Sequence, residues 1–190
     1  MTQAEFITSK NGLRLFWLLF AMTLIVVIAM QITGQPLKTA VAPGGIVSFE
    51  LIGSLEGSRN IIDSWQGVAM SWAGINLGMD FLFLTFYGIT IALGCLITRN
   101  RIRNEFQLIK QVGMWMAVGV LVAAGLDVIE NVSLIALLVG SENELLPVVA
   151  RYCAIPKFFL VAISLLYTMG GLLPVLRKTN HKRPKRVKIY

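Results

Sequence analysis

Four long apolar segments restrict the fold of this chain more than any other feature. They cover residues 15–32, 73–97, 112–139 and 155–176. About 20 residues of helix cross the hydrocarbon core of a bilayer, so each segment is long enough to span it. Only 14% of the 190 residues are charged, whereas a soluble domain averages about 25%. The sequence therefore predicts an all-α, four-helix transmembrane bundle that forms a single integral membrane domain over residues 1–190.

The first apolar segment also has some features of a secretory signal, because Lys10 and Arg14 precede it. Its uninterrupted run has 16 residues, which is long for a signal, and no clear cleavage site of small residues follows it. We therefore interpret residues 15–32 as an uncleaved first span.

Basic residues gather on one side of the predicted bundle. Thirteen of the 17 Lys and Arg residues lie in the N-terminal segment, in the connection of residues 98–111 and in the tail of residues 177–190. Because basic residues resist translocation, both termini are predicted to be cytoplasmic, in a multi-pass protein of the inner (plasma) membrane. We interpret the tail as a cytoplasmic topology determinant that contacts membrane lipids. A cytoplasmic protein partner is the alternative, and we expect no nucleic acid to bind.

Four ionisable residues lie inside the predicted spans, where each costs a few kcal/mol and needs a partner or a function. They are Asp80, Asp127, Glu130 and Lys157. Asp127, Glu130 and Asn131 share one face of the third span, at i, i+3 and i+4. Only inward packing of such faces shields them from lipid. The other two polar faces comprise Asn76, Asp80 and Tyr87 on span two, and Lys157, Ser164 and Thr168 on span four.

Two interpretations of these polar residues remain open. In the first, hydrogen bonds and an ion pair with Lys157 simply hold the helices together, or Lys157 extends into the headgroups instead. In the second, the excess of acids requires a protonated carboxyl or a ligand that neutralises it, which suits a binding or acid–base site. That site would comprise Glu50, Asn76, Asp80, Tyr87, Asp127, Glu130, Asn131 and Lys157.

Other chemistry has little support in the sequence. The single histidine, His181, lies in the basic tail, so His-based zinc sites and serine triads are excluded. Cys95 and Cys153 are predicted near opposite ends of their spans, too far apart for a disulfide, and should be free thiols. The sequence indicates no metal site and identifies no cofactor.

The connection of residues 35–72 is too apolar for a free loop. It begins with the segment PGGIVSFELIG, which carries Glu50. From Ser58 to Trp72, apolar residues recur at spacings of three and four, which predicts an amphipathic helix with Trp65 and Trp72 at the outer interface. We expect this extracytoplasmic segment to be either a simple interfacial anchor or a cap over the polar site, with Glu50 adding a fourth carboxylate.

Short motifs in this chain resemble a group of small bacterial four-span membrane proteins. The motifs are GIVSFEL (residues 45–51), MDFLF (residues 79–83), DVIEN (residues 127–131) and the early lysine of span four, Lys157. The resemblance covers residues 43–173, and Met79 stands where the group has leucine. It implies the same four-span fold and the same polar residues, but no activity that transfers to this chain. The residues it singles out are Glu50, Asp80, Asp127, Glu130, Asn131 and Lys157.

Three functions fit these features. The first is a binding or accessory protein whose polar site recognises a lipid-like or small amphipathic ligand. The second is an enzyme on a lipophilic substrate, with Asp127 or Glu130 as general acid or base and Lys157 stabilising negative charge. The third is a proton or cation conductor or transporter subunit, for which a homo-oligomer would supply the pore. If there is a site, Asp80, Glu130 and Lys157 should converge around a cavity that reaches the outer face.

Overall fold

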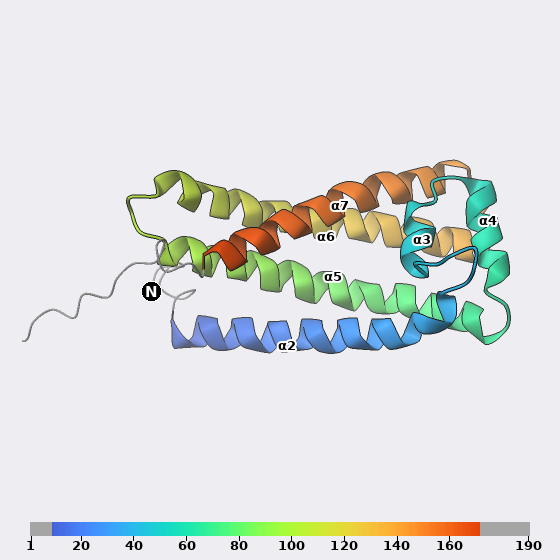
Figure 1. Ribbon diagram of the computed structural model, residues 1–190, viewed down its shortest axis with the longest axis horizontal. Helices are drawn as coiled ribbons and strands as arrows, with labels where there is room; N and C mark the ends of the chain where they lie inside the picture. Colours follow the sequence, from blue (N-terminus) through green and yellow to red (C-terminus); the bar gives the residue numbers. More distant parts are fainter. Residues whose placement is uncertain (1–8, 172–190) are drawn as a thin grey trace, which may run out of the picture.

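The computed structural model describes residues 9–171, and this part of the chain forms helices and no strand. Four long helices run side by side (Figure 1). Each is long enough and apolar enough to cross a membrane, which confirms the predicted all-α bundle of four membrane-spanning helices. The tail of residues 177–190, with His181, lies outside the described residues. The long helices are α2 (Lys10–Thr33), α5 (Val68–Arg101), α6 (Gln107–Leu138) and α7 (Leu145–Gly170).

The helices extend beyond the predicted spans. α5 has 34 residues, and α7 begins at Leu145, ten residues before the predicted start at 155. Hydropathy marks only the part of a helix that suits lipid, whereas the first turns of α7 pack on protein through the buried residues Pro147 and Ala150. Lys157 therefore lies about 18 Å from the start of α7 rather than a few ångströms, at 1.5 Å of rise per residue.

Three short helices gather at one end of the bundle, which we call the α4 end (Figure 1). They are η1 (Gln35–Leu37), α3 (Ile46–Leu51) and α4 (Leu55–Ser64). Trp65, only 2% exposed, packs edge-on against Phe49 at 5.4 Å between ring centroids. Its indole Nε1 donates a hydrogen bond of 2.9 Å to the carbonyl oxygen of Leu37. These contacts join the short helices into one cap with its own apolar core.

The prediction of a single amphipathic helix from Ser58 to Trp72 is wrong. α4 ends at Ser64, and α5 begins at Val68 and includes Trp72. Gly67 lies between them with a φ of 60°, a left-handed conformation that favours glycine and lets the chain turn into α5. Because of this break, Trp65 is buried in the cap, whereas the sequence pattern predicts it at the outer interface.

The long helices do not pack equally. α6 packs extensively against both α5 and α7, whereas α2 packs mainly against α5. A Cβ atom added at Gly88 of α5 would lie 3.2 Å from the Cβ atom of Ala124 in α6, so these two helices approach closely. Contacts to α2 include a hydrogen bond of 3.2 Å between the hydroxyls of Thr23 and Thr90. The bundle is therefore a tight three-helix core with α2 along one side.

Candidate functional site

A buried lysine stands at the centre of the polar cluster. The Nζ atom of Lys157 lies 2.8 Å from Oε2 of Glu130 and 2.9 Å from Oδ1 of Asp127. Lys157 is 5% exposed, and Asp127 and Glu130 are as deeply buried. The alternative in which Lys157 extends into the headgroups is therefore wrong. The ammonium of Lys157 in α7 instead binds two carboxylates of the neighbouring helix α6.

Hydrogen bonds connect this ion pair to α5. The hydroxyl of Tyr87 donates to Oδ2 of Asp127 at 2.9 Å, and the amide of Asn131 donates to Oδ2 of Asp80 at 2.6 Å. The same amide lies 3.3 Å from Oδ1 of Asp127. The polar faces of α5, α6 and α7 thus meet inside the bundle, as their spacing in the sequence indicates.

Glu50 brings a fourth carboxyl to the cluster from the cap. It lies in α3, is 6% exposed, and its Oε2 atom has no hydrogen-bond partner among the described residues. The pKa of Glu50 is raised to about 8, mainly by burial and to a smaller extent by the carboxylates of Glu130, Asp80 and Asp127, while Lys157 opposes the rise. The side chain is therefore largely protonated at neutral pH, although no described residue satisfies its buried oxygen.

A cavity of about 830 Å³ lies beside the cluster, between α2 on one side and α5 and α7 on the other. Polar residues line one part of its wall: Glu50, Asp80, Tyr87, Asp127 and Lys157. Most of the remaining wall is apolar and comes from residues such as Phe16, Phe20 and Val27 of α2 and Phe158 and Val161 of α7. Such a cavity is large enough for a small ligand and combines an apolar wall with a few convergent polar groups.

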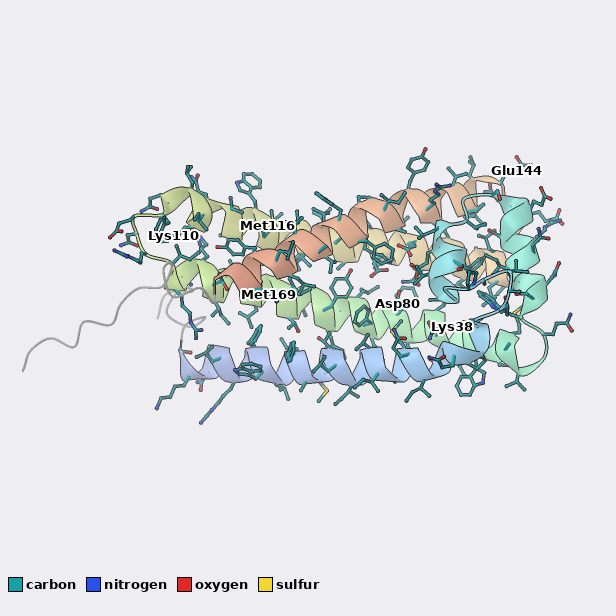
Figure 2. All side chains as sticks on the ribbon, viewed as in Figure 1. Lys38, Asp80, Lys110, Met116, Glu144 and Met169 are labelled. Atoms are coloured by element: carbon teal, nitrogen blue, oxygen red, sulfur yellow. The ribbon has the colours of Figure 1, made fainter. Side chains whose placement is uncertain are left out.

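The cavity reaches the α4 end of the bundle, where the exposed residues Lys38 and Gly44 belong to its wall. Figure 2 shows Lys38 and Asp80 in the half of the molecule that carries the cap. At the other end of the cavity, a Cβ atom added at Gly94 would contact both Phe16 of α2 and Thr168 of α7, so the three helices come together there.

The predicted site residues divide into two groups. Asp80 and Lys157 line the cavity as expected, but Glu130 and Asn131 lie outside its wall and contact only the cluster. Asn76 lines the cavity, but its amide is already bonded to α2, at 2.9 Å to the Met30 carbonyl and 2.8 Å to the Thr33 hydroxyl. Its main contact is therefore with a neighbouring helix.

Sequence analysis missed the contribution of α2 altogether. Most of its lining residues are apolar, as are its lipid-facing ones, so little in their chemistry distinguishes the two faces. The one available signal was Thr23, the only polar residue between Leu15 and Met30, which lines the cavity and bonds to Thr90.

The metal-ligating side chains and the cysteines of the described residues do not form a second candidate site. Within residues 9–171, no three His, Cys, Asp or Glu side chains gather closely enough to hold one metal ion. Cys95 and Cys153 are buried free thiols, as predicted.

A comparison with family models, curated proteins and solved structures finds no match to this chain. The geometry of the cluster and the cavity is therefore the basis of the functional interpretation.

Proposed function

We propose that this membrane protein binds a lipid-like or small amphipathic ligand in the cavity between α2, α5 and α7. The observation that carries the proposal is a cavity of about 830 Å³ whose apolar wall adjoins a buried polar cluster. The apolar part of a ligand would lie along α2, and its polar end would reach Glu50 and Asp80.

Two features support binding over a purely structural role. A cluster that only holds helices together is expected to satisfy its own polar atoms, because a buried unpaired group costs about 1–3 kcal/mol. Glu50 and Glu130 each leave a carboxyl oxygen without a hydrogen-bond partner among residues 9–171, and of the two only Glu50 lies in the cavity wall. In addition, α2 packs mainly on α5, so little protein needs to move for a ligand to enter between α2 and α7.

A matched pair of substitutions in α2 tests the proposal. Val27 lines the cavity, whereas its neighbour Ile28 does not and is 58% exposed. Val27→Trp should fill the space that a ligand would occupy, and Ile28→Trp should place the same bulk in the surrounding lipid. We expect lipids that copurify with the wild type in maltoside detergent, quantified by mass spectrometry, to be retained by Ile28→Trp and lost from Val27→Trp. Equal lipid content in all three proteins would contradict the proposal.

The orientation in the membrane is part of the same proposal: the α4 end faces the outer side of the inner membrane. Lys110 and Glu144 lie at opposite ends of the bundle (Figure 2). The Lys110 end also carries Arg99, Arg101 and Arg103, and basic residues favour the cytoplasmic side. In a background without Cys95 and Cys153, a membrane-impermeant maleimide added to intact cells should label Glu144→Cys and leave Lys110→Cys unlabelled. Labelling of Lys110→Cys but not of Glu144→Cys would show that the topology is the opposite of the proposed one.

A second candidate function is an enzyme that uses Glu50 as its acid. A carboxyl with a pKa of about 8 holds a proton at neutral pH and can donate it to a bound substrate, whereas Lys157 already binds Asp127 and Glu130. Glu50→Gln keeps the shape but cannot release a proton. If it retains the copurifying lipid but no longer changes the mass of that lipid during incubation, the enzyme is supported. Unaltered conversion would eliminate Glu50 as the acid.

A further inference from the structure

The charge balance around the cavity indicates what kind of polar end a ligand would carry. The single ammonium of Lys157 binds both Asp127 and Glu130, so its charge is already more than compensated. Asp80 adds a third carboxylate, which accepts a hydrogen bond from the neutral amide of Asn131. With these three carboxyls ionised, the buried cluster carries formal negative charge even when Glu50 is protonated. In a low dielectric such an excess strongly favours a cation and disfavours an anion.

The polar groups in the cavity wall accept hydrogen bonds where a ligand would contact them. Asp80, 7% exposed, lies in the wall, and Glu50 offers a carboxyl oxygen that has no partner within residues 9–171. Lys38, the other basic residue of the wall, is exposed at the α4 end, where water and salt screen its charge. This arrangement differs from an anion site, in which Lys157 would have to be free to bind the ligand.

We propose that the ligand of this cavity is an amphiphile whose polar end is a primary ammonium group, bound by Asp80 and Glu50 beside the Lys157 ion pair. The inference rests on the proposed ligand-binding function and specifies its chemistry. An ammonium supplies three hydrogen-bond donors and one positive charge, which match the carboxyl acceptors and the excess of negative charge. An apolar chain on that ammonium would lie in the cavity along Val27.

Three unbranched probes of matched length, about sixteen carbons each, separate the headgroups: hexadecylamine, hexadecanol and palmitate. At pH 7 the amine is a cation, as a lysine side chain is, the alcohol is neutral and palmitate is an anion. Each is titrated into the delipidated full-length protein in neutral maltoside detergent, and binding is counted by native mass spectrometry above the level found with Val27→Trp. We expect the amine to bind about tenfold or more tightly than palmitate, with the alcohol between them.

Two isosteric variants test whether Asp80 and Glu50 cause the preference for the amine. Asp80→Asn and Glu50→Gln should each reduce the advantage of the amine over the alcohol, because each removes a carboxyl from the wall while leaving its shape. Ile28→Trp, outside the cavity wall, should bind all three probes as the wild type does.

The outcomes distinguish this inference from the proposed function. Binding of palmitate that equals or exceeds that of the amine would overturn the ammonium assignment and leave the cavity a ligand site. An amine preference unchanged in both Asp80→Asn and Glu50→Gln would also overturn it. If none of the three probes binds above the Val27→Trp level, the cavity is not a lipid site, and the proposed function fails together with the inference.

Discussion

On one side of α5, helix α6 lies so close that a Cβ atom at Gly88 would be 3.2 Å from that of Ala124. On its other side, α2 is held by a few polar contacts, and a cavity of about 830 Å³ separates it from α7. The polar residues follow this division. Lys157 forms ion pairs with Asp127 and Glu130 between α6 and α7, whereas Glu50 and Asp80 lie in the cavity wall without an ion pair among the described residues.

In our proposal, the two sequence-based interpretations of the cluster apply to different parts of it. Asp127, Glu130 and Lys157 stabilise the contact between α6 and α7, as interhelical hydrogen bonds and ion pairs do. Glu50 has a buried oxygen without a partner among the described residues, which is the arrangement expected of a binding group. The proposed ligand site thus lies beside the ion pair that holds α6 and α7 together.

Removing the central ammonium should have the largest effect. Lys157→Met leaves the carboxylates of Asp127 and Glu130 buried without their partner, and breaking a buried ion pair in this way costs about 3–5 kcal/mol. We expect a loss of that size in the free energy of unfolding, measured by denaturant titration in mixed micelles. Arg59→Met is the matched control, because Arg59 forms an exposed ion pair with Glu142 at 2.8 Å.

The control substitution should change the free energy of unfolding by less than about 1 kcal/mol, the range of exposed pairs. A second substitution, Asp127→Asn, should recover part of the stability lost in Lys157→Met, since it removes one of the two unpaired charges. Equal losses in Lys157→Met and Arg59→Met would show that the buried pair contributes no more than a surface pair.

The next largest effect concerns Glu50 and pH. Its pKa is raised from 4.5 to about 8 by burial, in surroundings that include Lys157 of α7 and carboxylates of α5 and α6. The folded state then binds the proton more tightly than the unfolded state, so this stabilisation is present below pH 4.5 and lost as the pH rises through 8. Unfolding free energy should fall over this window, by at most about 1.4 kcal/mol per pH unit.

Glu50→Gln should flatten that pH profile, because the amide does not titrate. Glu56→Gln, which alters an exposed carboxylate of the neighbouring helix α4, should leave the profile as in the wild type. A profile of the same slope in Glu50→Gln and the wild type would assign the pH dependence to other groups and remove the case for a protonated Glu50.

The sequence predicts the paired part of the cluster well because a strict physical constraint acts on it. Asp127, Glu130 and Asn131 share a helix face, and no position in lipid tolerates such a face, so it must meet Asp80 and Lys157. The four membrane-spanning helices follow from apolar length by the same reasoning. In both cases the alternative arrangements are too unfavourable to compete.

The cavity could not be predicted in this way. A valine that faces a cavity and an isoleucine that faces lipid have the same chemistry, so the orientation of α2 leaves no pattern in Val27 and Ile28. Asn76 was assigned to the site because it shares a face with Asp80, yet its amide bonds to Thr33 of α2. The end of α4 depends on the backbone at Gly67, whereas the apolar periodicity continues past it.

The tight face of α5 should be sensitive to side-chain size. Gly88→Leu would force the side chain into Ala124 of α6, and overpacking of this kind costs about 1–3 kcal/mol. Gly78 lies in the same helix with nothing within 4 Å of an added Cβ atom, so Gly78→Leu should be neutral or slightly stabilising. Thermal unfolding of the two variants in detergent measures the difference, and equal stability would mean that α5 and α6 are not closely packed at Gly88.

The smallest effect is expected where α2 joins α5. Asn76→Leu removes two hydrogen bonds, to the Met30 carbonyl and the Thr33 hydroxyl, and interhelical hydrogen bonds in membranes contribute about 1 kcal/mol or less each. Thr85→Val is its control, because the Thr85 hydroxyl donates its hydrogen bond to the Phe81 carbonyl of its own helix. We expect Asn76→Leu to loosen α2 more than it lowers global stability, since the three-helix core does not depend on this contact. Hydrogen exchange should then increase around Thr33 while α6 and α7 stay protected. If exchange increases equally in α2, α6 and α7, the peripheral attachment of α2 is wrong and the four helices unfold as one unit.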